Sequence, residues 1–284
     1  MEQIRRIATV NDLSGFGRCS LTVAMPILAA MGFQPCPVPT AVLSAHTGYA
    51  GSQVRDLTED MAGYLTHWEQ LGVELAGVYT GFLGNGKQAD VLLPFLQKMA
   101  ERGGLRLVDP AMGDHGRLYE TCGGMVEPMK RLVAQASVAT PNLTELCLLT
   151  GYHYGLVKKD GPTRYRLSIE IMARRLLEDG CQAVVVTGID QGAGGQIENC
   201  VVSAVDRPAV WVGTPCVERT FAGTGDVFAS VLCGWLLRGL PLEEAVSETA
   251  DFVWRVTAYT AGLGTPEQDG IAFEPMLGEL CAKQ

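Results

Sequence analysis

The segment Ala222-Gly223-Thr224-Gly225-Asp226 is followed at once by the apolar run 227–237, which has the length of a buried helix. Small residues let the backbone turn sharply before the helix starts. A helix that starts near Gly225 directs unpaired N–H groups and the positive end of its dipole toward whatever lies in front of it. The segment therefore predicts a helix N-terminus that binds an anion such as a phosphate group.

Asp226 adds a chemical group to this predicted anion site. In the first helical turn its carboxylate would lie close enough to take a proton from a substrate hydroxyl while the N–H groups hold a phosphoryl group in transfer. Asp is also common at helix starts because it caps unpaired N–H groups, so a purely structural role is a second interpretation. On the first interpretation, the segment predicts phosphoryl transfer.

Composition narrows the class of protein. The chain has 284 residues, of which 47% are apolar and 19% charged, with a formal net charge of −9. The acidic balance disfavours a nucleic-acid partner. No apolar stretch approaches the roughly 20 residues that cross a bilayer, and the first apolar run is too short for a signal peptide. Nine scattered cysteines without a C-x-x-C pair fit neither a disulfide framework nor a zinc site. We expect a cytoplasmic protein with no membrane partner.

Short β-type runs alternate with helical patterns along the whole chain, which predicts one doubly wound α/β domain, residues 1–284, with a mostly parallel central sheet and helices on both faces. Several runs are almost continuously apolar, as strands covered on both faces are. The expected strands are residues 6–10, 34–40, 75–80, 105–108, 137–139 and 183–187. A glycine-rich segment, 192–195, then precedes an expected edge hairpin, 197–205 and 209–213. The expected helices are 21–31, 58–71, 87–102, 125–135, 168–179, 225–238 and 242–261.

The segments that follow the expected strands are polar and rich in glycine. Ligands of such sheets bind at the carboxyl ends of the strands, so these are the segments in which site residues are expected. Any one of them is compatible with ordinary turn chemistry, but their recurrence at strand after strand predicts a binding site along this edge. The segments are 11–17, 44–49, 80–84, 109–114, 140–145 and 187–188.

Two short motifs suggest other nucleotide-binding folds. Gly81-x-x-x-x-Gly86-Lys87 resembles a P-loop, but Gln88 stands where a magnesium-binding Ser or Thr is required. Residues 15–20 resemble a dinucleotide fingerprint, but its third glycine is missing and no acidic residue ends the second expected strand. Both motifs are therefore disfavoured.

Taken together, the strand-end motifs resemble the ribokinase superfamily and, within it, the pyridoxal kinase branch. The resemblance covers nearly the whole chain. Sugar kinases of that superfamily usually carry an extra β lid and an early paired-glycine motif, and neither is evident here. The resemblance therefore implies a ribokinase-like fold with no separate lid domain, and a B6 vitamer as substrate. It rests on four segments: 223–226, 109–114, 140–142 with Glu145, and Ser44-Ala45-His46-Thr47-Gly48-Tyr49.

The resemblance implies a reaction and assigns its catalytic residues. Asp226 would deprotonate the 5′-hydroxymethyl group of pyridoxal, pyridoxine or pyridoxamine, which attacks the γ-phosphate of ATP. The backbone N–H groups of Gly223, Thr224 and Gly225 would stabilise the phosphoryl oxygens.

The resemblance also implies residues for the nucleotide and for Mg²⁺. Asp109, Asn142 and Glu145 would organise Mg²⁺, directly or through water, since Mg²⁺ prefers oxygen ligands and retained waters. A monovalent cation such as K⁺ is a further candidate. Asn142 and Glu145 also match a helix-capping pattern, and both roles are compatible. The residues expected to face ATP are Asp109, Asp114, Tyr119, Asn142, Thr187 and Gly188.

For the vitamin ring, the matching positions are Asn11, His46, Thr47 and Tyr49. Many pyridoxal kinases have Ser near the position of Asn11, so the resemblance does not fix which vitamer is preferred. Phe16 and Phe82 are candidates to stack on the pyridine ring, although buried aromatic residues are more often part of the core.

The polar segment 114–124 lies where this family places a lid over the phosphates, and lids exclude water from the reaction. Tyr119 matches a lid position that would touch a phosphate. Cys122 on such a lid could form a reversible hemithioacetal with an aldehyde substrate. An exposed cysteine without a function is the alternative.

Two other functions are considered. A hydroxymethylpyrimidine kinase of thiamine synthesis shares the fold and the anion hole, but its usual early pattern is replaced here by Ser14-Gly15-Phe16-Gly17-Arg18. A non-catalytic B6-binding carrier belongs to another class, and it would not need Asp226. The family resemblance also implies a homodimer.

Overall fold

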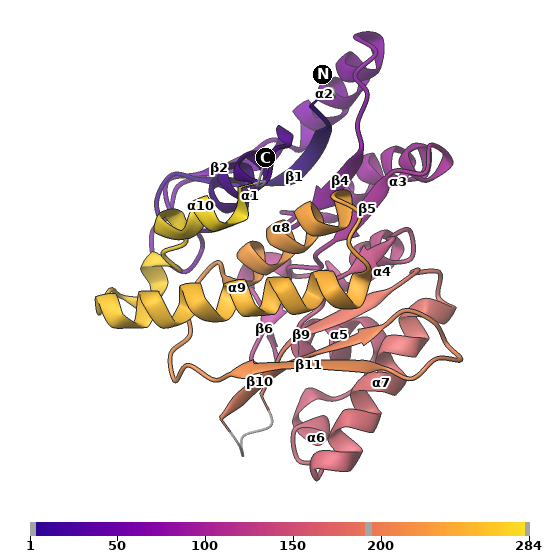
Figure 1. The fold of residues 1–284 in the computed structure, drawn as a ribbon. Helices are drawn as coiled ribbons and strands as arrows, with labels where there is room; N and C mark the ends of the chain where they lie inside the picture. The colour runs from indigo at the N-terminus through magenta and orange to yellow at the C-terminus, as the bar shows by residue number, and fades with distance from the viewer. Residues whose placement is uncertain (1–3, 191–194, 282–284) are drawn as a thin grey trace.

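The computed structural model describes residues 4–190 and 195–281. Within these residues, nine strands form one sheet in the order β11-β10-β9-β8-β5-β4-β1-β2-β3 (Figure 1). Strands β2, β1, β4, β5, β8 and β9 run parallel, while β3, at one edge, and β10 and β11, at the other, join by antiparallel pairing. The strands are β1 (Arg6–Ser14), β2 (Gln34–Leu43), β3 (Val54–Asp56), β4 (Gly77–Thr80), β5 (Leu105–Val108), β8 (Val138–Ala139), β9 (Val184–Asp190), β10 (Gln196–Val202) and β11 (Val210–Pro215).

Helices cover both faces of this sheet. The layer on one face contains α1 (Ser20–Ala30), α8 (Thr224–Leu237), α9 (Leu242–Leu263) and α10 (Leu277–Leu280). The layer on the other face contains α2 (Thr58–Gln70), α3 (Gly86–Glu101), α4 (Val126–Val133), α5 (Leu143–Thr150), α6 (Tyr154–Val157) and α7 (Pro162–Glu178). Figure 1 shows α9 lying along α8, near the C-terminal α10.

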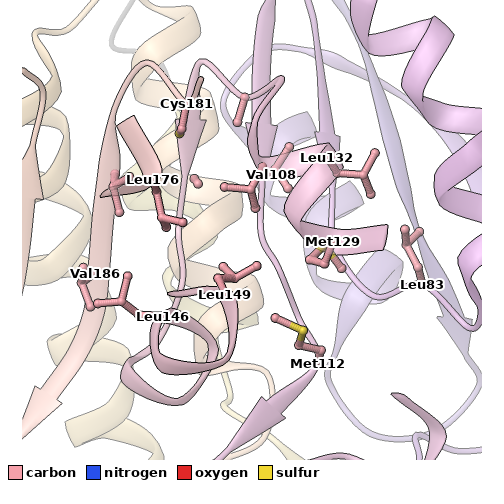
Figure 2. Packing of buried hydrophobic residues seen from close by; sticks show 14 of the residues in the cluster. Leu83, Val108, Met112, Met129, Leu132, Leu146, Leu149, Leu176, Cys181 and Val186 are labelled. Atoms are coloured by element: carbon pink, nitrogen blue, oxygen red, sulfur yellow. The ribbon is translucent and has the colours of Figure 1, made fainter. Parts of the chain in front are cut away.

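Side chains along the central strands alternate between two hydrophobic cores, as the two-residue period of a strand requires. In β1, Ile7 belongs to the core beneath α1 and α8, and Ala8 to the core beneath α3, α4 and α5. The second core includes Val108, Leu132 and Leu146, which Figure 2 shows converging between the sheet and its helices. This double covering confirms the predicted fold class of a mostly parallel, doubly wound sheet.

The structure corrects several predicted boundaries. Strand β1 continues to Ser14 and β2 to Leu43, because the two strands remain paired through an irregularity between Asn11 and Leu13. Asn11 is therefore a strand residue, held by the sheet instead of a loop. Helix α7 begins at Pro162, six residues before the predicted start at 168, and proline at the first helical position explains the earlier start.

Several short elements escaped sequence analysis because they are too brief to show a period. They are β3, α6, the two-stranded sheet of β6 (Gly113–Asp114) and β7 (Arg117–Leu118), and the 3₁₀ turns Glu120–Cys122, Glu267–Asp269 and Glu274–Met276. For α5 the sequence indicated the start, through the capping pattern of Asn142 and Glu145, but not the length of the helix. The expected edge hairpin is confirmed as the antiparallel pair β10–β11, whereas residues 192–194 of the glycine-rich segment lie outside the described residues. Across residues 4–190 and 195–281, every helix is too short or too polar to cross a bilayer.

Candidate active site

The N-terminus of α8 faces the carboxyl ends of the parallel strands and forms the centre of the candidate site. Its N-cap residue, Gly223, has a left-handed backbone with φ of 76°. A Cβ atom at Gly223 would lie 2.1 Å from the Arg18 carbonyl oxygen, so the loop before α1 leaves room only for glycine. Gly225 has nothing within 4 Å of where its Cβ would be. The start of α8 therefore packs tightly against the loop before α1 at Gly223 and has free space at Gly225.

Asp226 lies in the first turn of α8, three residues after the N-cap residue Gly223. Its carboxylate has partners outside α8, the Asn11 amide and the Ser20 N–H, so its contacts go beyond the capping of its own helix. Asn11 donates from Nδ2 to Asp226 Oδ1 at 3.5 Å. Burial raises the pKa of Asp226 to about 7, an effect that the Ser20 N–H and the Asn11 amide reduce. A carboxyl group with this pKa is poised to accept a proton near neutral pH.

Asp12 is a residue of the site that sequence analysis did not identify. It is buried, and its two oxygens accept hydrogen bonds from the hydroxyls of Ser14, at 2.8 Å, and Ser20. Ser20 has a φ of 51°, a left-handed conformation that non-glycine residues rarely adopt. Burial raises the pKa of Asp12, and its charge in turn raises the pKa of Asp226. The sequence signal that could have identified Asp12 is its position next to Asn11, directly after the first expected strand.

Tyr79 was also missed, because in the sequence it looks like an ordinary strand residue. Its side chain is buried, and its hydroxyl makes no hydrogen bond of standard length within the described residues. It nonetheless lies close enough to Asp226 to favour the ionised carboxylate. Burial, followed by the charges of Asp226 and Asp109, raises the pKa of Tyr79 far above its ordinary value.

Glu145 and Asn142 form the capping box that the sequence predicts, at the start of α5. Asn142 Oδ1 accepts from the Glu145 N–H, and Glu145 Oε2 accepts from the Asn142 N–H, each at 2.9 Å. Glu145 Oε1 also accepts from the Met112 N–H at 3.1 Å, and Asn142 Nδ2 donates to the Gly113 carbonyl at 2.9 Å. The pair therefore fixes the segment 109–114 against α5.

Asp109 follows β5 and is buried next to this capping box. Burial, followed by the charge of Asp226, raises its pKa to about 8. Burial and then the charge of Asp109 also raise the pKa of Glu145 well above its ordinary value. Two buried carboxyl groups that repel one another are an incomplete arrangement, which a cation would complete.

Thr187 and Gly188 lie next to this cluster in β9. The Thr187 N–H donates to the Pro141 carbonyl at 3.0 Å, and Thr187 forms an isolated parallel bridge with Asn142. Gly188 is exposed, with φ of 64°, and its N–H meets Asn199 Oδ1 at 3.3 Å. The tertiary structure thus places these two predicted nucleotide residues beside the Asn142 turn.

The predicted lid is the β6–β7 sheet with the turn that follows it. The Gly116 N–H donates to Thr144 Oγ1 at 2.8 Å, which ties the hairpin to the start of α5. Asp114 is exposed. Tyr119, directly after β7, keeps 41% of its surface exposed. Partial burial, followed by the charges of Glu145, Asp114 and Asp109, raises the pKa of its hydroxyl.

Cys122 requires a correction. Its side chain is 0% exposed and packs in the hydrophobic core with Leu83 and Met125, and burial raises the pKa of its thiol to about 11. The expectation of an accessible lid thiol was wrong, because the 3₁₀ turn Glu120–Cys122 directs the side chain inward. A neutral thiol with no solvent access is not placed to attack an aldehyde.

His46 and Tyr49 contact the C-terminal turn Glu267–Asp269, to which sequence analysis gave no role. His46 Nε2 lies 2.7 Å from the Gln268 carbonyl oxygen, and the Tyr49 hydroxyl donates to Asp269 Oδ1 at 2.5 Å. Gly17 and Gly48 leave space for the His46 ring, since a Cβ at either would lie within 3 Å of it. The loop 44–49 therefore packs between the segment that follows β1, where the His46 N–H donates to the Phe16 carbonyl, and the C-terminal turn.

The remaining predicted ring contacts differ in their burial. Thr47 is exposed at the tip of the loop 44–49. Phe16 is 55% exposed and meets the Tyr49 ring edge-on, with 5.3 Å between the ring centroids. Phe82 is partly buried against the core, and its N–H donates to Asn11 Oδ1 at 2.8 Å. The Phe82 backbone thus contacts Asn11, while the Phe16 ring packs against Tyr49 in the loop 44–49.

Comparison with known proteins places this fold and site in a family. Residues 26–269 match the sequence profile of the phosphomethylpyrimidine kinase family. The Bordetella avium protein named pyridoxine/pyridoxal/pyridoxamine kinase is 34% identical over 263 residues, which are 89% of this chain and 85% of that protein.

Two solved structures share the fold across nearly the whole chain. A Bacteroides thetaiotaomicron protein assigned to the phosphomethylpyrimidine kinases, in a crystal form with pyridoxal, is 35% identical with a TM-score of 0.89, covering 99% of this chain and 98% of that one. The pyridoxal kinase from Lactobacillus plantarum is 27% identical with a TM-score of 0.85, covering 98% and 97%. These structures define the class as ribokinase-like α/β kinases. The chain belongs to the pyridoxal kinase family, within the phosphomethylpyrimidine kinase profile.

Proposed function

We propose that this protein transfers the γ-phosphoryl group of ATP to the 5′-hydroxymethyl group of a B6 vitamer, and so salvages pyridoxal, pyridoxine or pyridoxamine as the 5′-phosphate. The observation that carries the proposal is the Asp226 carboxylate beside the open N-terminus of α8. A base and an anion-binding helix end, side by side, are the two parts that phosphoryl transfer to an alcohol needs. The names of the relatives and the pyridoxal-containing crystal form support the choice of substrate.

In this reaction Asp226 takes the proton of the hydroxymethyl group as its oxygen attacks the γ-phosphorus. The bond between that phosphorus and the β,γ-bridging oxygen breaks, and ADP leaves. The N–H groups of Gly223, Thr224 and Gly225 hold the phosphoryl oxygens, whose charge must be stabilised throughout the transfer. The pKa of Asp226, about 7, lets the base release the proton again after each turnover.

The nucleotide would lie along the side of the site formed by β9, α5 and the β6–β7 hairpin. Thr187 and Gly188 meet the Asn142 turn there. Asp114 and Tyr119, on the hairpin, would cover the phosphates and exclude water. The tie between the Gly116 N–H and Thr144 supports this placement, because it holds the hairpin over the start of α5.

Asp109 and Glu145 fit a magnesium site. Their pKa values are raised by burial and mutual repulsion, which is the arrangement that a bound cation relieves. Among the described residues, no cluster of three or more His, Cys, Asp or Glu side chains could hold a metal. Mg²⁺ suits so small a donor set, since it keeps waters and uses substrate phosphates as ligands. When bound, it would neutralise phosphate charge, and a monovalent cation such as K⁺ is a further candidate.

The vitamin ring would lie between Asp226 and the loop 44–49. His46, Thr47 and Tyr49 would shape that side, and the Phe82 backbone lies next to Asn11. Because the polar atoms of His46 and Tyr49 already bond the C-terminal turn, their contribution to binding would be mainly the shape of the loop. We further propose that the chain acts as a single domain in the cytoplasm. We also propose that it forms a homodimer, and the mass measured by sedimentation tests this assembly.

The name of the family profile makes hydroxymethylpyrimidine the second candidate substrate. It also carries a hydroxymethyl group on a heteroaromatic ring, so the same base and anion site would serve. A non-catalytic B6 carrier is the third alternative. The Asp226 carboxylate at the start of α8, with a pKa of about 7, argues against it, because a carrier needs no base.

ADP release separates these functions. The purified protein is given MgATP with pyridoxal, pyridoxine, pyridoxamine or hydroxymethylpyrimidine, and Asp226→Asn serves as the control. We expect turnover of at least one B6 vitamer that collapses in the variant. Turnover of the pyrimidine alone would assign the protein to thiamine synthesis, and vitamer binding without turnover would assign it to the carriers.

A further inference from the structure

We infer that Asn11 is a positioning residue for the base: its side-chain amide holds the Asp226 carboxylate in the orientation that accepts the substrate proton. The inference rests on the proposed function, and it replaces the ring contact that the family resemblance implies for this position.

The hydrogen bonds of Asn11 fix which way its amide points. The side chain is 1% exposed, and its Oδ1 accepts from the Phe82 N–H at 2.8 Å and from the Asp12 N–H at 3.1 Å. Only the oxygen of an amide accepts hydrogen bonds, so these two donors determine its orientation. Nδ2 is consequently the atom that faces Asp226, 3.5 Å from Oδ1 of the carboxylate.

The close approach of Gly81 also restricts the position of the Asn11 amide. A Cβ atom at Gly81 would lie 2.3 Å from Asn11 Nδ2 and 2.8 Å from Asn11 Cγ. Any residue other than glycine at this point would push the amide out of place. The absent side chain at Gly81 is therefore what allows Asn11 to reach Asp226 from β1.

This arrangement leaves the amide little capacity to recognise the ring. Both hydrogen bonds of Oδ1 are made within the protein, and one N–H of Nδ2 points to Asp226. A donor on one carboxylate oxygen fixes the plane of the group and favours its ionised form. Catalytic hydrogen bonds are often long before substrate binds and shorten in the reacting complex, and the 3.5 Å distance is compatible with such a bond.

Several groups besides Asn11 influence the protonation of Asp226, and any pH test has to consider them. They face it from separate elements of the fold: Asp12 in β1, Cys19 and Ser20 at the start of α1, Tyr79 in β4, Asp109 after β5 and Tyr119 after β7.

Asn11→Asp tests the inference, because it keeps the shape and the acceptor oxygen but replaces the N–H donor with a second carboxylate oxygen. We expect kcat at pH 7 to fall by about 30-fold or more and the acid limb of the kcat profile to move up by about one pH unit. The KM for pyridoxal should stay within about threefold, because ring binding is not the role of the amide.

Two further variants guard against a general loss of structure. Gly81→Ala leaves Asn11 in place but displaces its amide, so it should shift the pH profile in the same direction. Gln34→Glu is the control change from an amide to a carboxylate, because the exposed Gln34 side chain accepts from Arg6 Nε at 3.0 Å. A carboxylate oxygen accepts the same hydrogen bond, so kinetics should not change.

A large rise in the KM for pyridoxal, with kcat and the acid limb unchanged, would overturn the inference in favour of ring recognition. The ¹³C NMR titration of the Asp226 carboxyl, assigned by its loss in Asp226→Asn, gives a readout that needs no turnover. If the unaltered protein phosphorylates nothing, the proposed function fails. The titration of Gly81→Ala then still decides whether the amide holds Asp226, because this variant displaces the amide without adding a charge, and an unshifted pKa would overturn the inference.

Discussion

The raised pKa of Asp226 results from the groups that surround its carboxyl. Burial in front of α8 and the charge of Asp12 favour the protonated form, while the Ser20 N–H, Asn11 and Tyr79 favour the ionised form. The balance leaves its pKa at about 7, well above the usual range of an aspartate. One residue thus combines the ability to accept a proton with the ability to give it up at neutral pH.

This pKa predicts the pH dependence of the reaction. The base works only when ionised, so kcat/KM should rise about tenfold per pH unit below pH 7 and level off above it. Steady-state ADP release between pH 5 and 9 measures the profile, with pyridoxal at concentrations far below KM. Asp226→Asn should lower kcat by a factor of about 10² to 10⁴. A profile that is flat from pH 5 to 8 would show that another group is the base.

Glu145 combines a structural and a proposed metal role, and its replacement separates them. Glu145→Gln keeps one acceptor oxygen but sets an NH₂ group against a backbone N–H, since both carboxylate oxygens accept from the main chain. We expect a loss of about 1–3 kcal/mol in the free energy of unfolding, together with a higher Mg²⁺ concentration for half-maximal activity. Denaturant unfolding and a Mg²⁺ titration measure the two effects. Glu127→Gln, on the exposed side of α4, is the control.

At the scale of elements, the site is built where two helix N-termini meet the ends of the parallel strands. Helix α8 supplies the anion site, and the loop before α1 passes directly behind it, with Arg18 against Gly223. Helix α5 gathers the segment 109–114 through the capping box of Asn142 and Glu145. The sheet itself carries Asn11 and Thr187. Catalytic positions therefore come from rigid elements, which holds their relative geometry.

The two glycines of the α8 turn make a matched pair of variants. Gly223→Ala places a Cβ 2.1 Å from the Arg18 carbonyl, in a left-handed residue, so we expect it to destabilise the fold by about 2 kcal/mol or more. Gly225→Ala meets nothing within 4 Å and adds a better helix former. Its melting temperature should be equal or higher. Equal melting temperatures for both variants would contradict the packing described for Gly223.

At the scale of the whole molecule, the acidic site sets how stability depends on pH. The pKa values of Asp12, Asp109, Glu145 and Asp226 are all raised in the folded state. The folded protein therefore binds more protons than the unfolded chain between the ordinary carboxyl range and pH 8. Each such group contributes stability below its unfolded pKa, and that contribution is lost as the pH rises through its folded pKa.

We accordingly expect the melting temperature of the ligand-free protein to fall between pH 5 and pH 8. Asp109→Asn should flatten this dependence and raise the melting temperature at pH 8 by about 2 °C or more. Mg²⁺ with ATP should recover part of the loss in the unaltered protein, because a ligand that binds only the folded state stabilises it. Calorimetry at several pH values measures all three effects. A melting temperature that rises with pH over this range would contradict the expectation.

The sequence by itself determined the architecture and the class of chemistry. The alternation of short β-type runs with helical patterns predicted the doubly wound sheet. The small residues before the run 227–237 predicted the anion-binding start of α8. Both signals are local: strand and helix periods extend over a few neighbouring residues, and a capping box such as that of Asn142 and Glu145 spans only four.

Only the tertiary structure decided how those parts act together. The Asn11 amide meets Asp226 across 215 residues of sequence, and His46 meets Gln268 across 222. Cys122, expected on an exposed lid, is buried in the core. No periodicity records such contacts, because they depend on how separate elements pack and on the space that glycines such as Gly81 leave between them. The residues are readable in the chain, but their partners are set by the packing of the whole fold.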